Sequence, residues 1–509
     1  MTDVLLTHSY HLPYDRKQVR KMQPYPPLGT LYAAGLLRSK GISVAVFDTM
    51  LNDPDIGFKE ALRTHQPKIV AVYEDDFNFL TKMCLTRMRE VAWQILSDAK
   101  EFGCRVVAHG SDATDHVQDY LNGGFDFVLV GEAEHTLLDL IRAIGRGVDA
   151  SHIPGVVSPD SPLMTRDALK RVSSRNLPSD HLPFPARDLI DLEPYREAWL
   201  SAHGSFSLNL IAGRGCPFRC NWCAKPIFGD SFYSQPAEIV AQEMQILKET
   251  YGAQHLWFAD DIFALNRRWI QQLATEVEKR DCALPFKIQA RADLMTPETV
   301  ASLKRAGCTE IWMGVESGSQ KILDAMDKGL LVEQVHSARQ NLQQHGIRAG
   351  FFLQFGYPGE SWEDIKETVA LVRETRPNDI GVSFSYPLPN TKFYELVRQQ
   401  LGEKQNWSDS DDLCVMFKGA YTDGFYRAIR DALHAEVDSW KIVETPATPQ
   451  DDAINNLWLQ VDSLEPISRN SDATTLPGAI HNSASAPAGV CHSADLVPIR
   501  HLHASAGEG

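Results

Sequence analysis

The sequence predicts an α/β protein in two parts, a doubly wound, Rossmann-like N-terminal domain followed by a partial (β/α)6 barrel. Residues 1–150 alternate short, β-branched apolar runs with helical stretches, the pattern of strands buried on both faces of a parallel sheet. A second series of six strand–helix units occupies residues 205–395. A closed eight-unit barrel typically needs about 250 residues, so we expect a partial barrel here.

The composition fits such a globular protein and excludes several classes of function. The 509 residues suffice for two or three domains of roughly 100–200 residues each, and 43% of them are hydrophobic. The 66 acidic and 50 basic residues give a net charge of −16, which argues against a nucleic-acid partner. No apolar run approaches the ~20 residues of a membrane span, and the first residues lack the layout of a signal peptide. We therefore expect a cytoplasmic protein without a transmembrane segment.

The elements of the N-terminal domain follow from this alternation. The expected strands are 4–7, 44–47, 69–73, 105–108 and 127–130, and the expected helices are 28–39, 58–65, 80–102 and 114–121. Gly41 and Gly103 lie where helices should stop. Ligands of open α/β sheets bind at the carboxyl ends of the strands, so we expect the site of this domain there.

The remaining segments are assigned in the same way. Prolines recur across 151–204, which we interpret as a linker. The expected barrel strands are 208–212, 256–258, 287–290, 310–313, 349–355 and 381–386, and the expected helices are 237–249, 268–279, 297–306, 319–326, 332–345 and 362–375. A C-terminal helical extension follows over 396–440. Residues 441–509 are expected to be mostly disordered, because the end of the chain is rich in small and polar residues.

Three cysteines carry the clearest chemical signal. Cys216, Cys220 and Cys223 directly follow the first barrel strand, and thiolates at this spacing can converge on one soft metal centre. A structural zinc ion would need a fourth ligand, and only the isolated His203 or Cys282 could supply one. Three thiolates without a fourth suit a 4Fe–4S cluster that keeps one iron open. We favour the cluster and leave the zinc site as the alternative.

Polar and glycine-rich segments also end the later barrel strands. These segments are 259–261, 289–293, 314–319, 356–360 and 386–391. Their carboxylates can accept hydrogen bonds from hydroxyl and ammonium groups, an arginine can pair with a carboxylate, and glycines let a ligand approach the backbone. Each segment also has a plain structural interpretation as a helix cap, a turn or an ion pair at the barrel rim.

CxxxCxxC after the first strand of a six-unit barrel resembles the signature of radical S-adenosylmethionine (SAM) enzymes. The resemblance implies that SAM binds the open iron, and that the reduced cluster cleaves it to a 5′-deoxyadenosyl radical that abstracts hydrogen from an unactivated carbon. It also implies an electron donor such as flavodoxin or ferredoxin. The residues that it implies for SAM binding are Trp222, Asp260, Arg291, Glu316, Ser317, Gly356 and Gly359.

The N-terminal domain resembles the cobalamin-binding class of these enzymes, the group that includes the anaerobic magnesium-protoporphyrin monomethyl ester cyclase and related methylases. The matching stretches are 26–34 and 128–134. No Asp-x-His-x-x-Gly is present, so cobalt would have no histidine ligand from that motif. The cobalamin contacts that the resemblance implies are Gly29, His109, Gly110, Ser111, Gly131 and Glu132. The alternative is a domain kept for its fold or for substrate docking, since residues 73–76 are unusually acidic for a corrin site.

The function that the resemblance implies is cobalamin-dependent radical SAM catalysis, with methyl transfer to carbon. A radical SAM oxidative cyclase or rearrangement enzyme without methyl transfer is the first alternative, and a non-catalytic metal-binding scaffold is the second. We expect a small-molecule substrate of a lipid or tetrapyrrole-like kind. The sequence identifies no residue that takes part in the chemical step itself.

Overall fold

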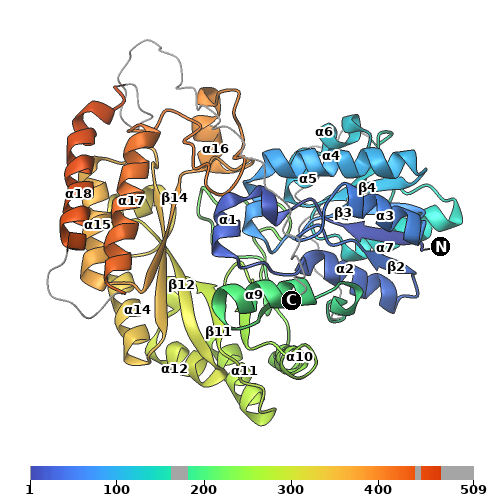
Figure 1. Ribbon diagram of the computed structural model, residues 1–509, viewed down its shortest axis with the longest axis horizontal. Coiled ribbons are helices and arrows are strands. Elements are labelled where there is room, and N and C mark those ends of the chain that lie inside the picture. The colour runs from blue at the N-terminus through green and yellow to red at the C-terminus, as the bar shows by residue number, and fades with distance from the viewer. Residues whose placement is uncertain (1, 162–181, 442–448, 472–509) are drawn as a thin grey trace, which may run out of the picture.

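The structure is a computed structural model that describes residues 2–161, 182–441 and 449–471. It contains two six-stranded sheets, one from each half of the chain, and a small two-stranded sheet (Figure 1). The predicted fold class is confirmed. The parts of the predicted linker over 162–181 and of the predicted disordered tail over 442–448 and 472–509 lie outside the described residues.

The first sheet is the predicted doubly wound sheet. Its strands are β1 (Val4–Thr7), β2 (Val44–Val46), β3 (Ile69–Tyr73), β4 (Arg105–His109), β5 (Phe127–Leu129) and β6 (Val156–Val157). They lie in the order β2-β1-β3-β4-β5-β6, with all neighbours parallel except β6. Strands β1, β3 and β4 are buried on both faces, as their unbroken apolar sequences predict.

Helices cover both faces of this sheet. They are α1 (Arg16–Lys21), α2 (Leu28–Ser39), α3 (Ile56–His65), α4 (Leu85–Glu101), α5 (Ser111–Asp115), α6 (Val117–Gly123) and α7 (Glu134–Arg146). Helices α3, α4 and α6 pack on one face, and α2 and α7 pack on the other. Figure 1 shows α4 and α2 on opposite sides of the strands.

Two predicted helices of this domain differ in detail. The helix expected over 80–102 begins as a 3-10 turn at Phe79–Lys82, because the Asn78 side chain accepts a hydrogen bond from the Leu80 backbone N–H. Helix α4 then starts at Leu85. The helix expected over 114–121 is split into α5 and α6, because the backbone of His116 leaves the helical region.

The segment interpreted as a linker contains regular structure. Besides β6, it forms α9 (Glu193–His203). Pro194 lies in the first turn of α9, where its missing N–H costs nothing, and Gly204 ends the helix in the left-handed conformation. The proline was therefore a helix start here and not a sign of irregular chain. The division into domains stays a prediction.

The second sheet is the predicted partial barrel. Its strands are β7 (Ser207–Leu210), β10 (His255–Phe258), β11 (Phe286–Ala290), β12 (Cys308–Glu316), β13 (Arg348–Phe355) and β14 (Asp379–Phe384). All neighbours are parallel, in the order β14-β13-β12-β11-β10-β7. In the described part of the chain β7 and β14 do not pair, so the barrel stays open.

The barrel helices pack on one face of this sheet. They are α10 (Ala237–Glu249), α11 (Arg267–Lys279), α12 (Pro297–Ala306), α13 (Gln320–Ala325), α14 (Val332–Gln344), α15 (Trp362–Thr375) and α16 (Lys392–Val397). Leu256, Ile288 and Ile311 face these helices and are fully buried among their apolar side chains. The strand residues of the other parity face the concave side of the sheet.

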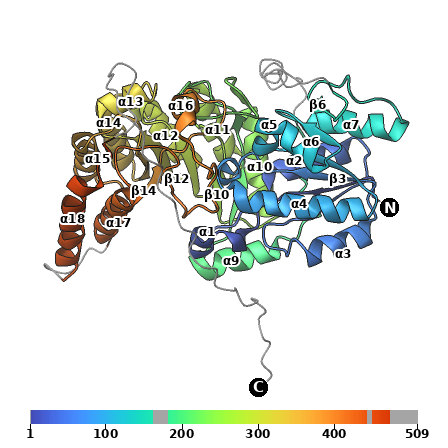
Figure 2. The same ribbon diagram turned by 90° about the horizontal axis from the view of Figure 1, so that it is seen from above.

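Two helices follow the barrel, α17 (Asp423–Ser439) and α18 (Pro449–Ser468), and they lie beside each other at the end remote from the N-terminal sheet (Figure 2). Helix α18 corrects the expectation of disorder for its part of 441–509. Val461 is fully buried, and the Trp458 indole N–H donates to Glu436 at 2.8 Å. No helix in the described residues is long and apolar enough to cross a membrane.

Candidate functional site

The three cysteines lie in a loop that a short hairpin closes after β7. The hairpin pairs β8 (Gly213–Arg214) with β9 (Tyr233–Ser234). Gly215 has a φ of +80°, and a Cβ there would collide with the Ser231 carbonyl, so only glycine fits. The Lys225 ammonium donates to the carbonyls of Cys216 at 2.9 Å and Phe218 at 2.5 Å. The loop is thus wrapped around one lysine before any metal binds.

The thiols themselves are free and partly exposed. Burial raises the pKa of Cys223 to about 12, and the Lys82 ammonium opposes this increase. In the described residues no three His, Cys, Asp or Glu side chains surround a single point that could hold one ion. A tetrahedral zinc needs such a grouping, whereas the cysteines of a 4Fe–4S cluster each bind a different iron. The three thiols of the loop could each bind one iron of such a cluster.

A buried ion pair lies beside this loop. The Lys328 ammonium donates to Glu316 Oε1 at 2.7 Å and lies 5.9 Å from the centre of the Trp222 ring. Glu316 ends β12 with a φ of +64°, which is rare for a residue with a side chain and is typical of strained functional positions. Burial opposes the charge of Lys328, but Glu316 outweighs it, so the pKa of Lys328 is raised.

Lys328 is a site residue that the sequence analysis missed. It belongs to no motif, and its place beside Glu316 arises only because the chain returns after α13. Gly314 permits the approach, since a Cβ there would lie 2.8 Å from Glu316 Oε1 and 2.9 Å from the Lys328 ammonium.

Arg291 lies beside the same ion pair, but most of its N–H groups already donate to the protein. Its guanidinium donates to the carbonyls of Lys328 at 2.7 Å and Gly329 at 2.8 Å, and to Asp293. Its plane lies 3.9 Å from the centre of the Phe218 ring in the cysteine loop. Arg291 therefore holds the Lys328 segment against the cysteine loop.

Two other predicted SAM contacts are engaged by the protein itself. Asp260 accepts hydrogen bonds from the backbone N–H groups of Ala212 at 3.0 Å and Gly213 at 2.6 Å, and burial raises its pKa to about 8. The Ser317 hydroxyl is fully buried against Thr368. Asp260 thus fixes the entry to the cysteine loop, and Ser317 fixes the end of β12 to α15.

The predicted glycines lie in the turn after β13. Gly356 and Gly359 have φ values of +79° and +81°, which favour glycine. The Gly356 N–H donates to Glu360 Oε2 at 2.7 Å. The structure thus brings Trp222, Arg291 and Glu316 together beside the cysteines, and gives Asp260, Ser317 and the glycines contacts within the protein. The role of each toward SAM stays a prediction.

The second group of predicted residues lies at the carboxyl edge of the N-terminal sheet. The His109 ring stacks on Tyr73 with centroids 4.0 Å apart, and its Nε2 lies 2.9 Å from the Gly131 carbonyl. Burial lowers the pKa of His109 to about 4, so the ring is neutral. His109 Nδ1, Ser111 Oγ and Asp76 Oδ1 are buried here without a hydrogen-bond partner. Three unpaired polar atoms at one sheet edge suit a polar ligand.

Glycines bring backbone segments close together at the same edge. The Gly29 N–H donates to Asp75 Oδ1 at 2.9 Å. Gly110 has a φ of +139°, and a Cβ there would lie 2.7 Å from the Glu74 side chain. Burial raises the pKa of Glu74 and raises that of Asp75 to about 6. This edge is therefore packed with carboxyl groups, as residues 73–76 suggested.

Arg214 connects the cysteine loop with the carboxyl edge of the N-terminal sheet. It precedes the cysteine loop directly, is buried, and pairs with Glu132 Oε1 at 2.5 Å and Glu134 Oε1 at 2.7 Å in the N-terminal domain. Tyr32 and Phe77 lie 5.2 and 5.3 Å from its guanidinium. Glu132, predicted as a cobalamin contact, thus forms an ion pair with the residue that leads into the cysteine loop. Neither partner signals this pairing in the sequence.

A pocket lies between the two parts of the chain. It is lined by Lys82, Leu85, Ser111, Asp112, Asp115, His116, Ala224, Pro226, Leu388 and Pro389. The Lys82 ammonium is buried 3.7 Å from Asp261 after β10. The pocket therefore connects the segment after Cys223 with the edge that carries Ser111.

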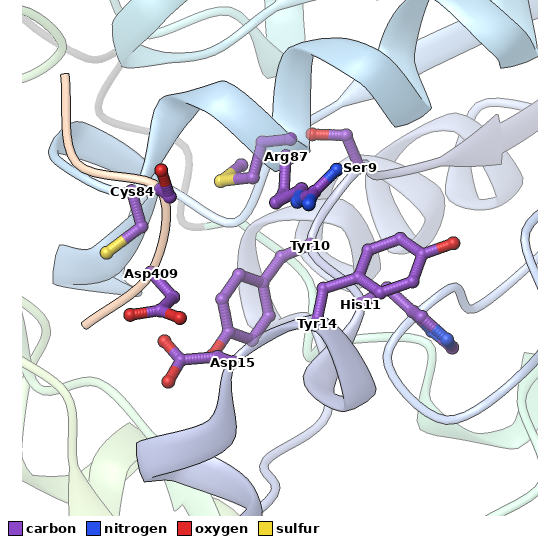
Figure 3. Close-up of a pocket in the computed structure, with 10 residues that line it drawn as sticks. Ser9, Tyr10, His11, Tyr14, Asp15, Cys84, Arg87 and Asp409 are labelled. Atoms are coloured by element: carbon purple, nitrogen blue, oxygen red, sulfur yellow. The ribbon is translucent and has the colours of Figure 1, made fainter. Parts of the chain in front are cut away.

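A further pocket lies where the segment after β1 meets the start of α4 and residues 408–409 (Figure 3). Figure 3 shows the carboxylates of Asp15 and Asp409 close together at one side of the Tyr10 ring, with the Cys84 thiol nearby. The Tyr10 hydroxyl is buried without a partner. Burial, together with Asp15, raises the pKa of Asp409.

Comparisons with known proteins show what the chain is similar to. Residues 210–372 match the radical SAM superfamily. The chain is 25% identical to an uncharacterised methyltransferase of Pyrococcus horikoshii over 389 residues, which are 75% of this chain and 81% of that protein. It is also 25% identical to the anaerobic magnesium-protoporphyrin IX monomethyl ester cyclase of Rubrivivax gelatinosus, over 75% of this chain and 67% of the cyclase.

Two solved structures share the fold across both halves. One is the radical SAM methyltransferase TsrM from Kitasatospora setae with cobalamin and a [4Fe-4S] cluster bound, with a TM-score of 0.63, 19% identity and 78% of each chain covered. The other is the cobalamin-dependent enzyme OxsB with aqua-cobalamin and SAM bound, with a TM-score of 0.61, 18% identity, and 92% of this chain and 72% of OxsB covered. Residues 210–372 are therefore similar to the radical SAM superfamily, and the chain shares the two-part fold of these two structures.

Proposed function

We propose that the protein is a cobalamin-dependent radical SAM enzyme that transfers a methyl group to a carbon atom of a small molecule. The observation that carries the proposal is the direct junction between the cysteine loop and the carboxyl edge of the N-terminal sheet. Arg214 makes this junction through Glu132 and Glu134. A cluster and a corrin bound at these two places would face one shared interface.

The cysteine loop would hold the cluster through the thiolates of Cys216, Cys220 and Cys223. When bound, the cluster supplies the electron that cleaves SAM to a 5′-deoxyadenosyl radical, and cobalamin supplies the methyl group. The chain contributes binding, orientation and shielding. Lys225 and the Asp260 carboxylate fix the loop from inside and from its entry.

The buried pair beside the loop suits the methionyl end of SAM. Glu316 can accept hydrogen bonds from its ammonium group, and Lys328 can donate to its carboxylate. Trp222 offers a flat surface for the adenine, and its indole N–H is buried without a partner. Arg291 acts as a positioning residue, because it holds the backbone of Lys328.

The edge of the N-terminal sheet supports a cobalamin site. His109, Ser111 and Asp76 offer unpaired polar atoms there, and Gly29 and Gly110 let the carboxyl-bearing segment 74–76 pack closely against them. The neutral His109 bonds the Gly131 carbonyl and stacks on Tyr73. We therefore assign it to the wall of the site and not to cobalt.

The wider setting follows from the same proposal. We propose a small-molecule substrate, an electron donor of the flavodoxin or ferredoxin kind, and a cytoplasmic location. A cyclase without methyl transfer is the second candidate, because the anaerobic magnesium-protoporphyrin IX monomethyl ester cyclase of Rubrivivax gelatinosus aligns with 75% of the chain. Product mass separates the two: methylation adds one CH2, and oxidative cyclisation removes hydrogen.

The test is reductive SAM cleavage by protein purified and reconstituted without oxygen. Wild type should form 5′-deoxyadenosine, and Cys216→Ala, Cys220→Ala and Cys223→Ala should each lose the cluster and the product. Cys282→Ala is the matched control, because Cys282 is buried behind α10, where its thiol donates to the Ala241 carbonyl. A loop variant that cleaves SAM like wild type would refute the cluster assignment.

A further inference from the structure

The concave face of the barrel sheet is partly open to solvent. Strand residues alternate between fully buried side chains that face the helices and partly exposed side chains on the concave face. The partly exposed ones include His255, Trp257, Lys287, Gln289, Glu310, Trp312 and Phe352. Three aromatic rings and one lysine among them make this face chemically distinct.

Trp312 and Phe352 form a flat aromatic shelf on this face. Their ring centres are 4.9 Å apart, with planes 31° apart. A Cβ at Gly350 would collide with the Trp312 indole, and one at Gly381 would lie 3.2 Å from Phe352. The two glycines on neighbouring strands therefore let the rings lie down on the sheet. The Trp312 N–H donates to Glu310 at 2.6 Å, which fixes the indole.

Lys287 lies on the neighbouring strand β11, beside Glu310 of β12 in the sheet register. Its ammonium is 5.4 Å from the centre of the Tyr25 ring and 5.5 Å from that of Trp257. Within the described residues it makes no hydrogen bond and no ion pair within 4.0 Å. Glu310, which pairs with Lys287 in the sheet register, is instead bonded to Trp312 and lies 3.4 Å from Arg348. Glu310 attracts the Lys287 ammonium without a direct ion pair, so this ammonium between two aromatic rings can still bind an external anion.

We propose that Lys287 binds a carboxylate of the substrate, whose apolar body lies on the Trp312–Phe352 shelf. This rests on the proposed function, because the shelf must lead to the reacting centre. It does so along β12, where Trp312 is followed by Gly314 and then by Glu316 of the pair beside the cysteines. Six residues separate Glu310 from Glu316, or about 20 Å at ~3.3 Å per residue. The substrate class is therefore an elongated or flat apolar carboxylic acid of up to that length.

Because the proposal depends on the charge of Lys287, the preference for a carboxylate ligand should depend on pH. Burial lowers the pKa of Lys287 to about 8, and Glu310 opposes that decrease, so the ammonium form is present at pH 6.5 and lost by pH 9.5. Of the groups around it, His255 has a pKa lowered to about 4 by burial and Tyr25 has a raised one, so neither changes charge in this range. The pKa of Lys21 is also lowered by burial, so only a Lys287 variant separates the two lysines.

The test compares two probes that differ only in charge, 1-pyrenebutyrate and 1-pyrenebutanol. Their dissociation constants are measured by equilibrium dialysis against cluster-reconstituted protein. At pH 6.5 wild type should bind the carboxylate at least tenfold more tightly than the alcohol, and this ratio should fall toward one at pH 9.5. Lys287→Met should bring the ratio at pH 6.5 to about one while it still binds the alcohol. Lys287→Arg should keep most of the preference.

Lys279→Met is the matched control, because Lys279 is exposed on α11 and its substitution removes the same charge away from the concave face. It should keep the wild-type ratio. Two results would overturn the proposal. One is a wild type that binds both probes equally at pH 6.5. The other is a Lys287→Met variant that keeps the tenfold preference for the carboxylate, even if it binds both probes more weakly. Probe binding requires no SAM cleavage, so wild-type cleavage on the same preparation shows separately whether the proposed function fails.

Discussion

The cysteine loop and the carboxyl edge of the N-terminal sheet are built in opposite ways. The loop is one short segment, folded around Lys225 and tied at its entry to Asp260. The edge is assembled from the ends of separate strands, and it keeps Asp76, His109 and Ser111 buried with unpaired atoms. The chemistry of a site built from one short segment can be predicted from the sequence. For a site assembled from distant segments, the sequence predicts only the fold.

Arg214→Met breaks the connection between these two regions and should have the largest effect. It leaves the buried Glu134 and the partly buried Glu132 without their cation, and the loss of one partner of a buried pair typically costs about 3–5 kcal/mol. We expect a lower Tm and a loss of SAM cleavage at temperatures where the variant is still folded. Thermal unfolding and 5′-deoxyadenosine formation measure the two effects.

Arg38→Met is the control for Arg214→Met. Arg38 pairs with Asp188 at the surface, and such exposed pairs contribute only about 0–1 kcal/mol. If both variants unfold alike and Arg214→Met cleaves SAM normally, the buried pair does not couple the regions.

Gly110→Ala tests the assembled edge alone. A methyl group there meets Glu74 in a backbone conformation that side chains rarely adopt, at a cost of about 1–3 kcal/mol. Cobalamin binding should fall while the iron content of the cysteine loop is unchanged. Gly41 also has a positive φ, of +81°, but a Cβ there would have nothing within 4 Å, so Gly41→Ala should keep cobalamin. Equal corrin losses in both variants would assign the effect to backbone strain and not to the edge.

Glu316→Gln tests the loop side alone. The amide can still accept a hydrogen bond from Lys328 but has lost its charge, so we expect SAM affinity to fall about tenfold, equivalent to about 1.4 kcal/mol. Iron content should remain that of wild type. Calorimetric titration with SAM measures the affinity, and a loss of iron would mean that Glu316 supports the loop instead.

Removal of the C-terminal segment is a further test, because it leaves both the cysteine loop and the carboxyl edge of the N-terminal sheet intact. Deletion of 472–509 should leave SAM cleavage and Tm unchanged. Deletion from 449 onward also removes α18 with its buried Val461, and it exposes the apolar surface against which Val461 packs. Tm should therefore fall, while SAM cleavage per folded molecule persists. A large loss of cleavage in the shorter deletion would show that residues 472–509 act at the site.

The sequence predicted the parts of this molecule that depend on local pattern. Both sheets follow from apolar runs whose periodicity is visible in the chain, and the cysteine loop follows from three nearby residues. The roles of Lys328 and Arg214 could not be predicted, because each depends on a partner brought close by a long-range fold. Helices α9 and α18 were missed because proline content and tail composition outweighed short helical signals. Asp260 and Ser317 were at the expected strand ends, but their hydrogen bonds to the protein require the structure.

The most direct test of the proposed function is the corrin content of wild-type protein purified without oxygen from cobalamin-fed cells, with its cluster reconstituted. The ultraviolet–visible spectrum is read beside the extracted corrin and the iron content. We predict about one cobalamin per chain together with the cluster. A full cluster without any cobalamin would contradict methyl transfer from a corrin and would favour the cyclase alternative.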